Sequence, residues 1–419
     1  MSQPEIVNPV SVDDADPWVR TFMTTMLGDP HQDEFPKRLD RWVRAWDPDR
    51  TWGVRDRGRW VATLATEERT LTVPGTGTTT NDIPADAVTA VTVAATHRRR
   101  GLLTRMLSDS LQAAKDRGDA VSVLLAAEWP IYGRYGYAPA TITANYRYHL
   151  RRPGAKIAPG DSSRVRQAEP DELGEIAPAV FDAARRLRAG QVDRRSPWWD
   201  RRLALDGYEM VSDARLNWFV HDGPDGADGL LSWKVSRDFE LNGLLGAVEV
   251  SDLIAANDEA YQDFWAYLGG IDVIDEIELH DRPVDEPIRW LLGDGRALQL
   301  TEAVDFLWVR LLDVPAALSA RGYAIEGRVV LDVVDLETGS YGAGRVALTA
   351  GAHGTKCEPT DEPADLQISQ RALASIYLGG HRLRQRDIMR DVTELTPGAR
   401  DRVDVMFATS LAPWTQTGF

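Results

Sequence analysis

The stretch Val91-Thr-Val-Ala-Ala-Thr-His-Arg-Arg-Arg-Gly-Leu-Leu-Thr-Arg-Met-Leu107 decides the fold of this chain. Residues 89–93 are mostly β-branched or apolar and predict a buried strand. After the basic loop at 96–101, apolar residues recur from Leu102 at the spacing of one helix face. A strand that enters a helix through a glycine-containing loop presents free backbone N–H groups and the positive end of the helix dipole. The stretch therefore predicts an anion site in this loop.

The same loop carries a family pattern. Arg98-x-x-Gly101-x-Leu103 resembles the pyrophosphate loop of the GCN5-related N-acetyltransferases (the GNAT superfamily), with Leu103 in place of the usual small residue. The longer string at 96–103, Thr-His-Arg-Arg-Arg-Gly-Leu-Leu, is similar to the enhanced intracellular survival (Eis) branch. The alternative is a solvated basic helix start, which three arginines at the positive end of a helix dipole make unfavourable. The resemblance implies acetyl-CoA as the cosubstrate, bound by Val91, Thr92, Val93, Arg98, Arg99, Arg100, Gly101, Leu102, Leu103, Thr104, Ala127 and Glu128.

The composition of the chain limits the classes of protein to which it can belong. Its 419 residues suit two or three domains, and no run approaches the ~20 apolar residues of a membrane span. No signal peptide is visible and the single Cys357 excludes an internal disulfide, so we expect a cytoplasmic protein. Without a surrounding motif, Cys357 is expected to be a packing residue rather than a nucleophile. The net charge of −16 disfavours nucleic acid and favours cationic partners, and the seven histidines have no metal-ligand spacing.

A second motif supplies a candidate general acid. The string Ile131-Tyr-Gly-Arg-Tyr-Gly-Tyr137 resembles the family stretch Ile-Tyr-Gly-Arg-Phe-Gly-Tyr, in which the tyrosine at the position of Tyr132 is the general acid. The chemistry needs such a group, because the sulfur that departs from a thioester requires a proton, and a phenol with a pKa of ~10 is protonated at neutral pH. A structural tyrosine that caps a loop carbonyl is the alternative; with the Arg98 motif upstream, we favour the acid. The family often has serine where Ala127 stands, so backbone contacts to the cofactor are expected there.

The chain end, Ala412-Pro-Trp-Thr-Gln-Thr-Gly-Phe419, is the third indication. Eis proteins end in an aromatic residue whose α-carboxylate is the catalytic base, which implies that role for Phe419. A frayed tail is the alternative, but Pro413, Trp414 and Phe419 are unusually apolar for one. An α-carboxylate has a pKa of ~3.5 in water, and burial would raise it. Gly418 stands where many family members have an acidic residue, which leaves the breadth of cationic substrates open.

Residues 14–46 predict two helices joined by Gly28-Asp29-Pro30. In the family, the corresponding helices lie over the acceptor groove. Acidic and aromatic side chains there could hold an ammonium group by charge and cation–π contact. An aromatic stripe that simply packs in the core is the more economical alternative. The candidate substrate-binding residues are Asp29, Glu34, Trp42 and Trp46.

The order of predicted elements gives an α/β (α+β) fold with three domains. Strands are expected at 51–56, 60–72, 87–95, 120–126 and 141–150, with a helix at about 98–117. This order and the resemblance imply a catalytic GNAT domain at 1–157, a degenerate GNAT-like domain at 158–300, and a sterol-carrier-protein-like α+β domain at 301–419. In the second domain the Arg-Arg-Arg-Gly loop is replaced by Asp252 and Asn257-Asp-Glu259, and an acidic loop should repel a pyrophosphate.

These observations predict an acetyl-CoA-dependent N-acetyltransferase without a metal. The sequence has no motif for a cysteine or serine nucleophile, so direct transfer of the acetyl group to an amine in a ternary complex is expected. The resemblance implies that the acceptors are polycationic small molecules such as aminoglycosides, and that the chain forms a homo-hexamer. Two alternatives remain: a protein or peptide lysine N-acetyltransferase, and a non-catalytic lipid-binding or interaction protein.

Overall fold

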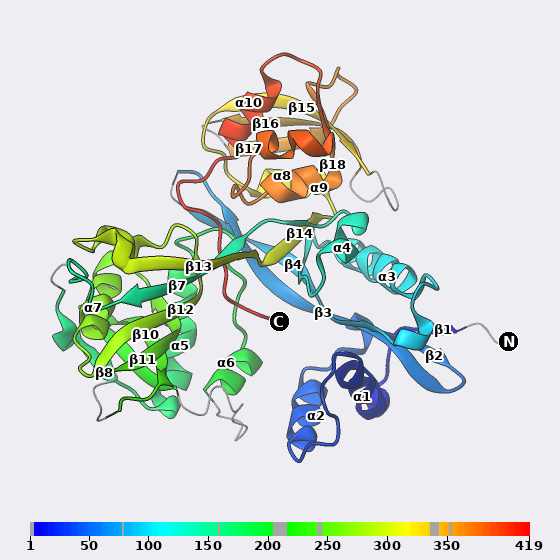
Figure 1. The fold of residues 1–419 in the computed structure, drawn as a ribbon. Coiled ribbons are helices and arrows are strands. Elements are labelled where there is room, and N and C mark those ends of the chain that lie inside the picture. The colour runs from blue at the N-terminus through cyan, green and yellow to red at the C-terminus, as the bar shows by residue number, and fades with distance from the viewer. Residues whose placement is uncertain are drawn as a thin grey trace.

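The computed structural model describes residues 4–77, 79–157, 160–203, 216–240, 245–335, 343–351 and 354–419. Within these ranges the chain forms three sheets, each with its own helices (Figure 1). The first sheet lies in the centre of the molecule. The second, in green and yellow, lies to one side of it, and the third, in orange and red, lies above it. The expected α+β class is confirmed.

The first sheet has the strand order β1-β2-β3-β4-β5-β14-β6. Helix α3 (Leu102–Asp116) packs on it through an apolar face that includes Met106, Leu107 and Leu111. Helices α1 (Ala15–Thr25) and α2 (Phe35–Arg44) form a separate aromatic cluster against β3, and the short α4 (Trp129–Tyr132) follows β5. The strands are β1 (Glu5–Val7), β2 (Thr51–Asp56), β3 (Arg59–Pro74), β4 (Thr80–Val93), β5 (Val121–Leu125), β6 (Ala138–Pro139) and β14 (Leu307–Leu311).

The second sheet has the order β13-β7-β12-β11-β10-β9-β8 and is covered by α5 (Pro170–Arg185), α6 (Ser196–Arg202) and α7 (Asp258–Gly269). Its β11-α7-β12 unit repeats the β4-α3-β5 unit of the first sheet, since both units join two parallel strands through a helix. The strands are β7 (Ile142–His149), β8 (Val165–Gln167), β9 (Asn217–Gly223), β10 (Gly226–Arg237), β11 (Gly246–Ala255), β12 (Ile274–Pro283) and β13 (Leu298–Asp305).

The third sheet has the order β17-β16-β15-β18-β19 and packs against α8 (Val314–Ala320), α9 (Gln370–Ile376) and α10 (Ala399–Met406). Its core is continuous with that of the first sheet, because apolar residues of β14 and α9 belong to one buried cluster. The strands are β15 (Gly327–Val334), β16 (Gly344–Gly351), β17 (Gly354–Pro359), β18 (Leu366–Ser369) and β19 (Val392–Glu394). None of the helices in the described ranges combines the length and apolar character that a bilayer crossing requires.

Two strands lie in a different sheet from the one that their position in the sequence suggests. The strand expected at 141–150 as the last of the first domain is β7, and it lies in the second sheet between β12 and β13. The place beside β5 is filled by β14 from far along the chain. The expected boundaries at 157 and 300 therefore do not divide the two sheets. Ala144, Tyr146 and Tyr148 alternate along β7 and are buried, but such alternation does not say which sheet the buried face joins.

Two element boundaries also differ from expectation. Strand β4 begins at Thr80 rather than at the expected residue 87, so Pro84 is paired with Thr70 in the ladder. Helix α3 begins at Leu102 rather than near Arg98. The helix cannot begin earlier because Gly101 is in the left-handed region with φ of 73°. The arginines therefore lie in a loop before the helix.

Candidate active site

The parallel strands β4 and β5 part at their carboxyl ends. Their pairing runs from Ala85 and Val121 to Val88 and Leu124, whereas β4 continues to Val93. The N–H of Ala94 donates to Val61 on β3 at 2.8 Å. Because N–H groups alternate along a strand, the N–H of Val93 points to the opposite edge, toward the gap beside β5. A ligand strand could pair with β4 there.

A β-bulge shapes this end of β4, and sequence reasoning missed it. Thr63 pairs with Thr92 and Ala65 pairs with Thr89, so β4 has one more residue than β3 between these pairs. Ala90 takes up the extra length with φ of 51°. The Thr63 hydroxyl donates to the Ala90 carbonyl at 2.8 Å. Alanine has no preference for this conformation, so nothing in the local sequence could have indicated the bulge.

The loop between β4 and α3 presents backbone donors and positive charge. Arg99 and Gly101 both have positive φ, 62° and 73°. The side chains of Arg98, Arg99 and Arg100 are exposed, and Arg100 also donates to the Thr96 carbonyl at 3.0 Å. The first helical N–H with an acceptor is that of Arg105, which donates to Gly101 at 3.1 Å. Across the described ranges, the backbone N–H groups of residues 98–104 have no acceptor, which suits a pyrophosphate.

The remaining predicted cofactor residues lie around this gap. Val91 and Val93 are half-buried and Thr92 is buried, with its hydroxyl 2.6 Å from that of Thr63. Leu102 is buried in the core that α3 covers, and Leu103 packs against the same core. Thr104 bonds to the Tyr135 hydroxyl at 2.9 Å, while Ala127 and Glu128 are exposed just after β5.

Tyr132 lies at the end of α4, close beyond the end of β5. It is 6 % exposed, and its ring meets that of Tyr137 edge-on at 6.2 Å. Burial, aided by the negative charge of Glu128, raises the pKa of Tyr132 to about 12. The phenol therefore keeps its proton at neutral pH.

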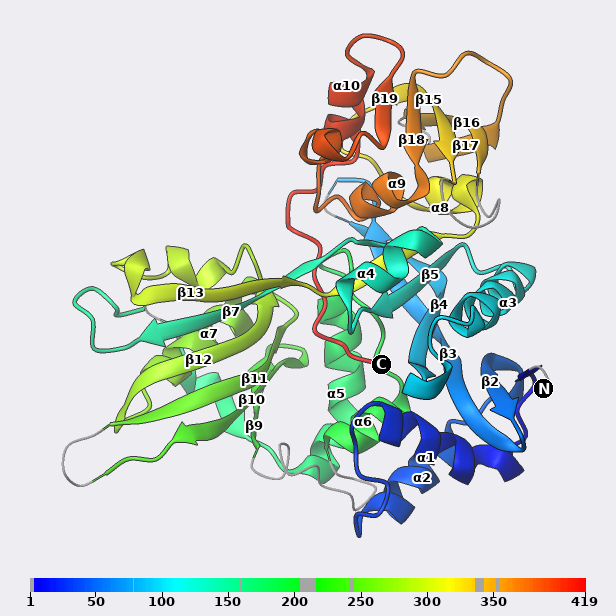
Figure 2. The ribbon, with the colours of Figure 1, turned by 45° about the vertical axis from the view of Figure 1, so that its right-hand side comes forward.

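The C-terminal tail ends at the same edge of the first sheet. A Cβ added to Gly418 would lie 3.9 Å from Leu125, the last residue of β5, and Phe419 is half-buried beside it. In both views the chain end lies between β3 and the helices α5 and α6 of the second sheet (Figure 2). The structure thus gathers the basic loop, the α4 segment and the chain end at the carboxyl edge of the β4–β5 pair.

Among the candidate substrate residues, Trp42 and Trp46 are half-buried and Asp29 and Glu34 are exposed. Trp42 and Trp46 pack against Trp18 with ring centroids 5.6 and 5.3 Å apart, and the Trp46 indole donates to the Val10 carbonyl. Both tryptophans thus pack in part against the aromatic cluster, and contact of all four residues with a substrate stays a prediction.

The second copy of the motif differs at its helix start. The side chain of Asn257 caps α7 by accepting from the Ala260 N–H at 2.8 Å, so one donor that a phosphate would need is occupied. Asp252 was expected in this loop, but it lies within β11 with its side chain 1 % exposed. Its charge is paired with Arg194 and Arg202 at 3.1 and 2.6 Å. The loop is less acidic than expected, and its capping argues against a bound pyrophosphate.

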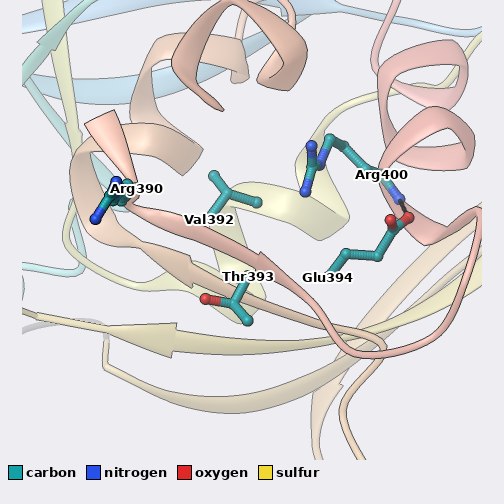
Figure 3. A pocket seen from close by; sticks show the side chains of 5 residues that line it. All are labelled: Arg390, Val392, Thr393, Glu394 and Arg400. Carbon is teal, nitrogen blue, oxygen red and sulfur yellow. Dashed lines mark hydrogen bonds between the residues drawn. The ribbon is translucent and has the colours of Figure 1, made fainter. Parts of the chain in front are cut away.

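An open surface pocket of about 450 Å³ lies at the third sheet (Figure 3). It is lined by Arg390, Val392, Thr393, Glu394 and Arg400. With Val392 as the apolar member of this set, the lining does not favour a sterol or another apolar ligand. Cys357, in β17, is buried, and burial raises the pKa of its thiol to about 12, so it is not a nucleophile at neutral pH.

Three stretches of the chain match known domain families. Residues 7–140 and 190–311 each match a family described as acetyltransferase (GNAT) domain. Residues 314–416 match a family described as sterol carrier protein domain. The expected succession of two GNAT-like domains and a sterol-carrier-protein-like domain is confirmed.

Relatives of similar length are found among proteins and solved structures. The chain is 35% identical to an uncharacterized N-acetyltransferase of Streptomyces avermitilis over 99% of both chains. It is 35% identical to the N-acetyltransferase Eis of Mycobacterium tuberculosis over 74% of both. The crystal structure of Eis1 from Mycobacterium abscessus superposes with a TM-score of 0.83 at 30% identity over the whole of both chains. A GCN5-related N-acetyltransferase of Anabaena variabilis shares the fold, with a TM-score of 0.82 at 18% identity.

Proposed function

Because the chain belongs to the Eis-like family of GNAT N-acetyltransferases, we propose that it transfers the acetyl group of acetyl-CoA to amines of polycationic small molecules such as aminoglycosides. One observation carries the proposal: the basic loop, Tyr132 and the chain end meet at one sheet edge. The net charge of −16 supports a cationic acceptor through electrostatic attraction.

The loop residues are proposed to hold the cosubstrate. The free N–H groups of residues 98–104 and the start of α3 would bind the pyrophosphate, and Arg98, Arg99 and Arg100 would add charge. The edge of β4 at 91–93 would orient the pantetheine and polarise the thioester carbonyl. Bound acetyl-CoA supplies the activated acetyl group.

The acid and the base are proposed to be Tyr132 and Phe419. The amine nitrogen forms a bond to the acetyl carbon while the carbon–sulfur bond breaks. The α-carboxylate of Phe419 accepts the proton that the amine loses, and the Tyr132 phenol donates a proton to the departing sulfur. A ternary complex without a covalent intermediate is consistent with the inert thiol of Cys357. By family resemblance the enzyme is further proposed to be a cytoplasmic homo-hexamer, which sedimentation analysis would test.

The test combines an acceptor comparison with one extension of the chain. Coenzyme A release is measured with an aminoglycoside, a polyamine and a lysine peptide; turnover with the peptide alone would favour the lysine acetyltransferase alternative. An alanine added after Phe419 should abolish turnover with every acceptor, because the carboxylate moves by one residue, ~3.5 Å. The dissociation constant for acetyl-CoA should not change. Full turnover in the extended protein would exclude the terminal carboxylate as the base.

A further inference from the structure

The last residues of the chain are buried without the support of regular secondary structure. Residues 412–419 belong to no helix or strand, yet Thr415 and Thr417 are fully buried and Trp414 is 9 % exposed. In both ribbon views this red segment runs past the second sheet to the middle of the molecule (Figures 1 and 2). Its path must therefore be fixed by individual contacts.

The first of these contacts hold residues 412–414 of the tail. The Trp414 N–H donates to the Ala189 carbonyl at 2.9 Å, and its indole donates to the Asp281 carbonyl at 2.8 Å. The Ala412 N–H donates to Asp285 at 2.8 Å. All three acceptors lie in the second GNAT-like part of the chain.

Nearer the end, the tail meets a buried ion cluster. The Gln416 amide donates to Asp252 Oδ1 at 2.7 Å, and Arg194 Nε donates to Thr417 Oγ1 at 3.2 Å. Arg194 and Arg202 pair with the Asp252 carboxylate, and the Ser232 hydroxyl donates to it at 3.2 Å. The Arg194 guanidinium also lies 3.9 Å from the ring centre of Trp198.

The cluster keeps Asp252 charged despite its burial. Burial favours the neutral acid, but the two arginines outweigh this effect and lower the pKa of Asp252. A rigid, ionised carboxylate accepts a stronger hydrogen bond from the Gln416 amide than a neutral group would. The anchor is therefore stable at neutral pH.

The position of the anchor matters for the reacting atoms. Three residues, 417–419, follow Gln416, and a chain of that length reaches about 10 Å when it is free. A general base must lie within about 3 Å of the proton that it removes. Fixing Gln416 therefore removes most of the volume that the terminal carboxylate could otherwise explore.

We infer that Asp252, held by Arg194 and Arg202, is a positioning residue that places the chain end at the thioester through Gln416. The degenerate GNAT-like domain then serves catalysis by holding the base rather than a cofactor. The inference rests on the proposed role of Phe419.

The test is a pair of reciprocal variants. Gln416→Glu sets a second carboxylate against Asp252 and should release the tail. Turnover should fall roughly 10²-fold, because a misplacement of about 1 Å has that effect, while KM for acetyl-CoA stays the same. Hydrogen–deuterium exchange in the peptide 411–419 should become faster. Combining Gln416→Glu with Asp252→Asn restores one amide and one carboxylate, and should recover most of both properties.

A matched control is Gln367→Glu. The Gln367 amide donates to Asp332 at 3.0 Å on the exposed surface of the third sheet, so the chemical change is the same at a remote place. It should alter neither turnover nor exchange in the tail.

The outcomes separate this inference from the proposed function. Unchanged exchange in Gln416→Glu, at any turnover, would overturn the anchor. Faster exchange with full turnover would show that turnover does not need a fixed chain end, which would overturn the positioning role, whereas the alanine added after Phe419 tests the role of the terminal carboxylate separately. Faster exchange with lost turnover, both restored in the double variant, is the expected result.

Discussion

At the scale of single residues, Tyr132 owes its suitability as an acid to its surroundings. Packing against Tyr137 leaves it 6 % exposed, and the ionised phenolate would lie in an apolar environment close to Glu128. The pKa of Tyr132 is therefore raised to about 12. The phenol thus stays neutral at neutral and moderately alkaline pH, and it remains able to donate its proton to a thiolate.

Tyr132→Phe should reduce turnover about 10²–10⁴-fold, because it removes the proton donor without changing the shape of the site. Acetyl-CoA affinity, measured by calorimetry, should stay the same. In the native enzyme, turnover should not decline between pH 8 and pH 10, since the raised pKa keeps the phenol protonated there. Tyr148→Phe removes a buried phenol of the second sheet, whose hydroxyl donates to the Ala155 carbonyl, and serves as the control. A descending limb near pH 10 that Tyr132→Phe abolishes would contradict this assignment.

At the scale of elements, the loop between β4 and α3 depends on backbone conformation as much as on its arginines. Gly101, with φ of 73°, lets the chain turn into α3 while the N–H groups of the first turn stay free. A Cβ at this position would meet no atom within 4 Å, so a substitution there strains the backbone without a steric clash. The left-handed conformation costs a non-glycine residue roughly 1–2 kcal/mol.

Gly101→Ala should therefore weaken acetyl-CoA binding about 5- to 30-fold, as this strain displaces the loop from its binding conformation. Isothermal titration calorimetry measures the effect. Gly118→Ala is the matched control, because Gly118 follows the same helix, has φ of 90° and also has open space around its Cβ. Gly118→Ala should lower the stability of the enzyme about as much as Gly101→Ala does. Its dissociation constant for acetyl-CoA should equal that of the native enzyme. Equal weakening by both variants would mean that the loop has no special part in binding.

At the scale of the whole molecule, each of the first two sheets contains a strand from outside its own predicted domain. Sheet one needs β14, and sheet two needs β7. Leu307, Trp308, Val309 and Leu311 of β14 are all nearly fully buried. Each contributes about 1.5–3 kcal/mol by burial, so their loss removes about as much free energy as the whole stability of a typical domain, about 5–15 kcal/mol.

A fragment of residues 1–157 should accordingly fail to fold, although it contains every predicted cofactor residue. It lacks β14, and its β7 has neither β12 nor β13 beside it. Circular dichroism should show no cooperative thermal transition for the fragment, in contrast to the full chain. A sharp transition and acetyl-CoA binding by the fragment would show that the first sheet does not need the exchanged strand.

The sequence by itself determined the features that depend on neighbouring residues. The strand–loop–helix at 89–116 and the place of Tyr132 after β5 follow from periodicity, turn residues and motif strings. The order of the three domains follows from these together with the family resemblance. The tertiary structure alone decided which sheet β7 and β14 join, where the Ala90 bulge lies and what holds the tail. Asp252 shows the reason: read locally it is an acidic loop residue, but it is a buried partner of Gln416, 164 residues away in sequence. Such pairings arise from packing between distant segments, and no local pattern encodes them.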